Sequence, residues 1–73
     1  MTRVAAIGER QRVIGLATAG VMVVPAEGAQ AVRAAWYGLP ADVGLVILTP
    51  AAAVALGSGP LDVEEPLTAV MPP

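Results

Sequence analysis

The chain has 73 residues, enough for one small domain, and it combines 56% hydrophobic residues with only 14% charged ones. A net charge of −2, with four arginines and no lysine, argues against the clustered basic surface that binds nucleic acid or anionic lipid. The absence of cysteine excludes disulfides and thiolate chemistry, and no apolar run reaches the roughly 20 residues that span a bilayer.

Two strands, each followed by a helix, are predicted in the first half of the chain. The strands at residues 4–7 and 21–24 are short, continuous and apolar, as parallel strands buried on both faces are. The helices are expected over residues 9–19 and 27–37, and we expect Gly15 to let the first of them pack closely against the sheet. The helix faces expected to be buried carry apolar residues at helical spacing: Val13, Leu16, Ala17 and Gly20 in the first, and Ala29, Val32 and Trp36 in the second.

The second half of the chain predicts another strand and helix, and then a last strand. Residues 44–48 form an apolar strand, and Thr49 with Pro50 is a typical helix start, with a hydroxyl at the N-cap and a proline in the first turn. A short helix over residues 51–56 follows, and residues 67–71 form the final strand.

The alternation of four strands with three helices predicts one α/β domain over residues 1–73. Strands joined by helices form a parallel sheet with right-handed crossovers and with helices on both faces. We expect the strand order 2-1-3-4, as in a small flavodoxin-like or Rossmann-like sheet.

Catalytic chemistry is difficult to assemble from these residues. The chain has no histidine or cysteine, and its one serine, Ser58, lies in a glycine-rich break. Glu64 and Glu65 are adjacent in an expected surface loop and are interpreted as solvated. Glu9 alone follows a strand at the edge where such folds bind ligands, and no partner group for acid–base work accompanies it. A minimal enzyme built around Glu9 is the weakest hypothesis, and no metal site or cofactor is expected.

Nucleotide binding and phosphoryl transfer are also disfavoured by the motifs. The segment from Gly8 to Gly15 matches neither phosphate-binding glycine motif, no lysine is present to reach a phosphate, and Glu9 would repel an anion. A phosphorylation receiver shares the expected strand order. It requires an aspartate after the third strand, where Thr49 stands, and a lysine that the chain lacks.

The two aromatic residues, Trp36 and Tyr37, are adjacent at the end of the second expected helix. One interpretation is that Trp36 fills the core while Tyr37 lies at the surface. The other is that one of them anchors a protein partner, because tryptophan and tyrosine are enriched in binding hot spots.

Three segments together resemble the F subunit of the V-type (vacuolar and archaeal-type) ATPases. The first runs from residue 4 to residue 21, with glycine turns separating apolar runs, and the second is the strand at residues 42–49. The third is Pro66 followed by an apolar run that ends at Pro72. The positions that match the family are Gly8, Glu9, Gly15, Ala19, Gly20 and Gly44.

This resemblance implies a non-catalytic rotor subunit in the central stalk of a proton-translocating ATPase or ATP synthase. It implies docking on the coiled-coil stalk subunit, and a cytoplasmic location peripheral to the membrane. The family's C-terminal helix has no counterpart before Pro73, and its third helix is longer and charged.

Two surfaces are candidates for contact with the partner. One is formed by Gly8, Glu9 and Thr49, after the first and third strands, and the other by Trp36 and Tyr37. The alternative function is a regulatory or ligand-binding module with a receiver-like fold that lacks the phosphorylation residues. Because apolar residues are abundant and charges few, we also expect the isolated chain to self-associate or to require its partner.

Overall fold

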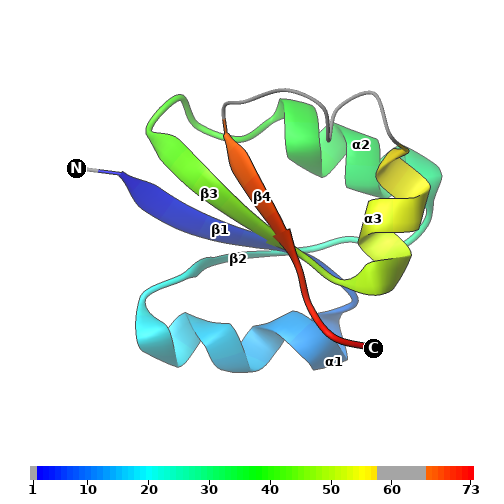
Figure 1. Cartoon of the computed structure of the whole chain (residues 1–73), viewed down its shortest axis with the longest axis horizontal. Helices are drawn as coiled ribbons and strands as arrows, with labels where there is room; N and C mark the ends of the chain where they lie inside the picture. The colour runs from blue at the N-terminus through cyan, green and yellow to red at the C-terminus, as the bar shows by residue number, and fades with distance from the viewer. Residues whose placement is uncertain (1, 58–65) are drawn as a thin grey trace.

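A computed structural model describes residues 2–57 and 66–73 of the chain. Its strands form one parallel sheet in the order β2-β1-β3-β4, and helices lie on both faces (Figure 1). The predicted fold class and strand order are therefore confirmed. The strands are β1 (Arg3–Gly8), β2 (Met22–Pro25), β3 (Val43–Leu48) and β4 (Leu67–Val70). The helices are α1 (Arg10–Val13), the 3-10 helix η1 (Ile14–Ala19), α2 (Ala29–Tyr37) and α3 (Pro50–Leu56).

The main core lies between the sheet and the layer formed by α2 and α3. Alternate residues of the central strands, such as Ile7 of β1 and Leu48 of β3, point into this layer and are fully buried. Val32 and Trp36 of α2 complete the packing from the helix side. The other buried members of this core are Ala5, Val43, Val46, Ala52 and Leu56.

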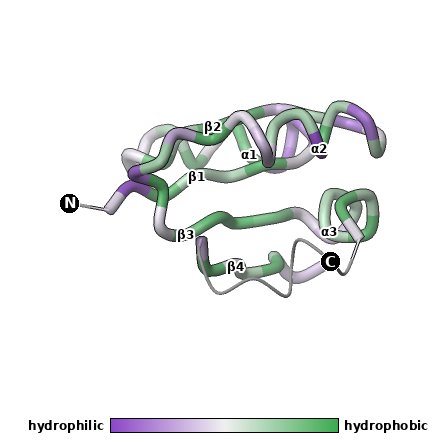
Figure 2. The backbone as a smooth tube through the Cα atoms, turned by 90° about the horizontal axis from the view of Figure 1, so that it is seen from above, coloured by the Kyte–Doolittle hydropathy of each residue, from purple (hydrophilic) through white to green (hydrophobic). Residues whose placement is uncertain are grey.

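The opposite face of the sheet is only partly covered. α1 and η1 pack on β1 and β2, and Figure 2 shows them to one side of β3 and β4. The register places Leu45 and Ile47 of β3 and Leu67 of β4 on this face, where the first two are half-buried and Leu67 is 63% exposed. An apolar strip along β3 and β4 is therefore accessible beside α1.

The first helix differs from the prediction of one continuous helix over residues 9–19. Glu9 is its extended N-cap, the α-helical part has only four residues, and the remainder is the 3-10 helix η1. Of the residues expected on its buried face, Val13 is buried and Leu16 half-buried, but Ala17 and Gly20 are exposed. A 3-10 helix has 3.0 residues per turn rather than 3.6, so positions chosen by α-helical spacing no longer share one face in η1.

Gly15 does not provide the expected close approach to the sheet. A side chain added at Gly15 would meet nothing within 4 Å, because this position faces away from the protein. Gly20 does end the helix as predicted, since its φ of 82° is in the left-handed region that favours glycine.

The other boundaries differ from the prediction by only one or two residues. α2 begins at Ala29 because Gly28 has a φ of 86°, which a helix cannot contain, and Ala29 itself is exposed. β4 ends at Val70, and the expected loop at residues 58–65, with Ser58, Glu64 and Glu65, lies outside the described residues.

Candidate functional site

The carboxyl edge of the sheet brings Gly8, Glu9 and Thr49 together. Thr49 follows β3 and is fully buried, and its backbone N–H donates to the carbonyl oxygen of Ile7 at 3.2 Å. Its hydroxyl donates to a carboxylate oxygen of Glu9 at 2.5 Å and accepts the N–H of Ala52 at 3.2 Å. A side chain on Gly8 would collide with that of Thr49. These contacts make Gly8 and Thr49 enclosed structural residues.

Glu9 is the half-buried member of this group and remains accessible at the edge. The hydroxyl of Thr49 lowers the pKa of Glu9, with smaller contributions from the backbone N–H of Glu9 and the charge of Arg12. Arg12 in turn donates from Nη2 to the carbonyl oxygen of Pro72 at 2.7 Å. The edge therefore holds an ionised carboxylate, and it ties the segment after β4 to α1.

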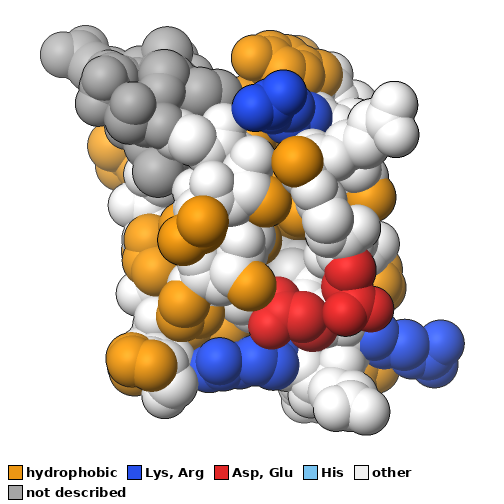
Figure 3. Space-filling view, turned by 90° about the vertical axis from the view of Figure 1, so that its right-hand side faces the viewer, with side chains coloured by type: hydrophobic (Ala, Val, Ile, Leu, Met, Phe, Trp, Pro, Cys, Tyr) orange, Lys and Arg blue, Asp and Glu red, His pale blue; other side chains and the backbone are white. Residues whose placement is uncertain are grey.

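A small cavity of about 120 Å³ opens at the same edge, between the starts of α2 and α3. Figure 3 shows acidic side chains gathered near the middle of this side of the molecule. The residues that line the cavity are Glu9, Ala26, Glu27, Gly28, Val32, Ala51 and Ala52. Ligands of open parallel sheets bind at this edge. This cavity is smaller than the roughly 300 Å³ of typical ligand pockets, and its two carboxylates disfavour phosphates.

Metal binding by a cluster of side chains has no support within residues 2–57 and 66–73. No group of three or more potential metal ligands occurs there. The carboxylates of Glu9 and Glu27 line one cavity because both residues follow parallel strands, β1 and β2. Their proximity was not predicted, although their positions after adjacent strands could have indicated it.

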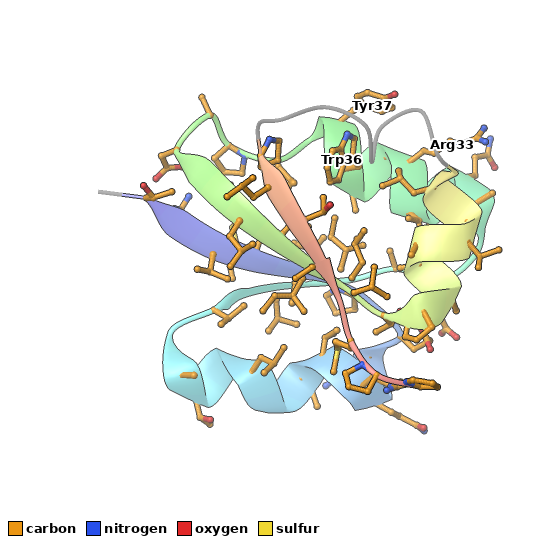
Figure 4. All side chains as sticks on the ribbon, viewed as in Figure 1. Arg33, Trp36 and Tyr37 are labelled. Atoms are coloured by element: carbon orange, nitrogen blue, oxygen red, sulfur yellow. The ribbon has the colours of Figure 1, made fainter. Side chains whose placement is uncertain are left out.

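The two aromatic residues occupy opposite environments. Trp36 is 8% exposed and belongs to the core, whereas Tyr37 is 73% exposed. Figure 4 shows Tyr37 at the outer side of α2, away from the sheet. The interpretation of Trp36 as a core residue and Tyr37 as a surface residue is confirmed. Tyr37 is thus the most accessible of the residues predicted to contact a partner.

Arg33 is a surface residue that was not among the predicted site residues. It is exposed and lies one helical turn before Tyr37 on α2. Residues four apart share a helix face, so the exposure of Tyr37 could have indicated that of Arg33.

Comparison of the sequence with models of known protein families gives no match, and comparison with curated proteins gives none either. In the part of the chain that the structure describes, every helix is too short or too polar to cross a membrane.

Proposed function

We propose that the chain is a non-catalytic subunit in the rotating central stalk of a V-type proton-translocating ATPase or ATP synthase. The observation that carries this proposal is the resemblance to the F subunit of these complexes, which extends in order from the first strand to Pro72. One of the matching glycines stands where the fold excludes a side chain, because a Cβ on Gly8 would collide with the buried side chain of Thr49. Gly20 has the positive φ that favours glycine. The resemblance and the fold therefore agree at these positions.

The architecture is suited to a mechanical role. The sheet and the layer of α2 and α3 share one packed core, and the bond between Glu9 and Thr49 joins two loops of the carboxyl edge, as expected of a body that moves as a unit. Such a body transmits rotation and position when it is clamped to a shaft, and this requires no chemistry of its own. The coiled-coil stalk subunit is the shaft in this proposal, and the complex places the protein on the cytoplasmic side of the membrane.

Co-purification tests this proposal directly. Tagged chain expressed in its own host should bring down the coiled-coil stalk subunit and the catalytic head subunits of the ATPase. Unrelated protein with the same tag is the control. Recovery of the chain without any ATPase subunit, under conditions that keep the complex intact, would contradict the proposal.

The acidic cavity at the carboxyl edge favours one alternative function, a small ligand-binding module. A ligand that binds only the folded state adds about 2.7 kcal/mol of stability at a hundredfold excess over its Kd. A thermal-shift screen of small cationic and neutral ligands, which suit a cavity lined by two carboxylates, therefore separates the two functions. Stabilisation that disappears in a Glu9→Gln, Glu27→Gln variant would place the ligand in the cavity and favour the alternative.

A further inference from the structure

Arg33 and Tyr37 form an exposed pair on the outer side of α2. Both point away from the sheet in Figure 4, whereas their neighbours Val32 and Trp36 are buried in the core. Side chains four residues apart on a helix have Cβ atoms about 6 Å apart and share one face. The backbone under the pair is therefore fixed by core packing, while the two side chains remain free to meet a partner.

Arg33 supplies the charge of the helical layer formed by α2 and α3. It is the only charged residue in α2 or α3. Its guanidinium has no ion pair or hydrogen bond with any of the residues that the structure describes, whereas Arg3 pairs with Asp42 at 2.8 Å. A carboxylate on a partner that covers this face would offset the cost of burying a guanidinium that has no partner among the described residues.

The surface around the pair is formed by the exposed side chains of α2 and α3. α2 and α3 pack side by side, and Val54 of α3 is 82% exposed. Of the other exposed side chains of the two helices, Ala29, Ala31, Ala34 and Ala51 are short, whereas Gln30, three residues before Arg33, is polar. A helix lying here would meet small apolar side chains together with one cation, one amide and one aromatic ring.

We propose that this Arg33–Tyr37 face of α2 docks on an acidic helix of the coiled-coil stalk subunit. A carboxylate of that helix pairs with Arg33, and an apolar side chain one turn away packs on the ring of Tyr37. The inference rests on the proposed function and specifies its contact surface. Coiled-coil helices carry charged residues beside their seam, so an outward carboxylate is available on such a shaft. The accessible apolar strip along β3 and β4, formed by Leu45, Ile47 and Leu67 and called the bare strip below, carries no charge. It therefore has no group that would select an acidic helix.

The test is to measure binding of the purified coiled-coil stalk subunit to the chain at about 50 mM and about 300 mM salt. The Arg33→Gln variant should bind about tenfold more weakly at low salt, and its Kd should depend much less on salt, because an ion pair is lost. The Tyr37→Ala variant should bind at least about tenfold more weakly at both salt concentrations. Arg10→Gln removes an exposed arginine from α1 and should bind like the wild type.

Each of the following outcomes would overturn the proposed surface, the ion pair or the proposed function. Wild-type binding that neither Arg33→Gln nor Tyr37→Ala weakens would overturn this surface and leave the proposed function intact. Loss of binding in Leu67→Lys alone would place the partner on the bare strip instead. Equal weakening of Arg33→Gln at both salt concentrations would exclude the carboxylate pair. Absence of wild-type binding would overturn both the surface and the proposed function. Circular dichroism of each variant identifies any loss of folding.

Discussion

The hydroxyl of Thr49 donates to the carboxylate of Glu9, and this bond joins two loops that lie 40 residues apart in the sequence. The same hydroxyl accepts the N–H of Ala52 and so caps α3. One buried side chain therefore connects the turn after β1 with the start of the helix after β3. The carboxyl edge of the sheet depends on this connection for its shape.

Replacing Thr49 with valine should destabilise the fold by about 1 to 3 kcal/mol. The substitution keeps the volume but removes the helix cap and the donor to Glu9, and it leaves the N–H of Ala52 without its partner. Urea unfolding measures the change. Thr18→Val is a matched control, since the hydroxyl of Thr18 is exposed and, among the described residues, bonds only to the carbonyl oxygen of Gly15. Equal stability of the two variants would contradict the capping role.

Alanine at Gly8 and alanine at Gly15 should have opposite effects. At Gly8 the new methyl group would collide with Thr49, and overpacking of this kind costs about 1 to 3 kcal/mol. At Gly15 the methyl group meets nothing and replaces a residue of low helix propensity, so a gain of up to about 1 kcal/mol is expected. Thermal unfolding of the Gly8→Ala and Gly15→Ala variants measures both changes in stability. Destabilisation at Gly15 similar to that at Gly8 would show that the first helix packs closely after all.

The pH dependence of stability should contain a contribution from Glu9. Its pKa is lowered from 4.5 by the Thr49 hydroxyl, so the folded state favours the carboxylate more than the unfolded state does. The resulting stabilisation is complete above the unfolded pKa and is lost as the pH falls through the lower folded pKa. In urea unfolding between pH 7 and pH 3, the Glu9→Gln variant should lose less stability than the wild type.

A double variant separates this contribution from other carboxylates. In a Thr49→Val background the main cause of the lowered pKa is absent, so Glu9→Gln should change the acid dependence of stability much less. An undiminished effect of Glu9→Gln in that background would show that Thr49 is not the cause.

The sheet could be predicted because its signals are local. Residues 4–7 and 44–48 are continuous apolar runs, and Thr49 with Pro50 marks a helix start whatever the rest of the chain does. The mixed α and 3-10 form of the first helix could not be predicted, since the apolar spacing of residues 13–20 fits an α-helix and gives no signal of a 3-10 turn. Spacing of 3.6 residues per turn placed Ala17 on the same face as Val13, but the 3.0 residues per turn of η1 rotate Ala17 to the exposed side.

Part of the candidate site could also be predicted because its signals are local. Glu9 and Thr49 were identified because each follows a strand, but the bond between them depends on the parallel pairing of β1 with β3. Arg12 and Pro72 are 60 residues apart, and no sequence pattern indicated their contact. Periodicity did allow Trp36 to be assigned to the core, and the same periodicity leaves Tyr37 outside it.

The isolated chain should self-associate through the bare strip and the free edge of β4. Leu67 is 63% exposed on this face, and in the described part of the chain β4 pairs only with β3. Exposed apolar strips and unpaired strand edges without charges favour association between copies. Sedimentation at micromolar concentration should therefore detect species larger than a monomer.

A single charge on the strip should reverse this association. Leu67→Lys places an ammonium group where a second copy would have to bury it, so the variant should sediment mainly as a monomer. Val54→Lys is the matched control, because Val54 is even more exposed but lies on α3, on the other side of the sheet. It should leave the association unchanged. A wild-type chain that stays monomeric at these concentrations would contradict the prediction. Dissociation by Val54→Lys but not by Leu67→Lys would move the contact to the helical layer.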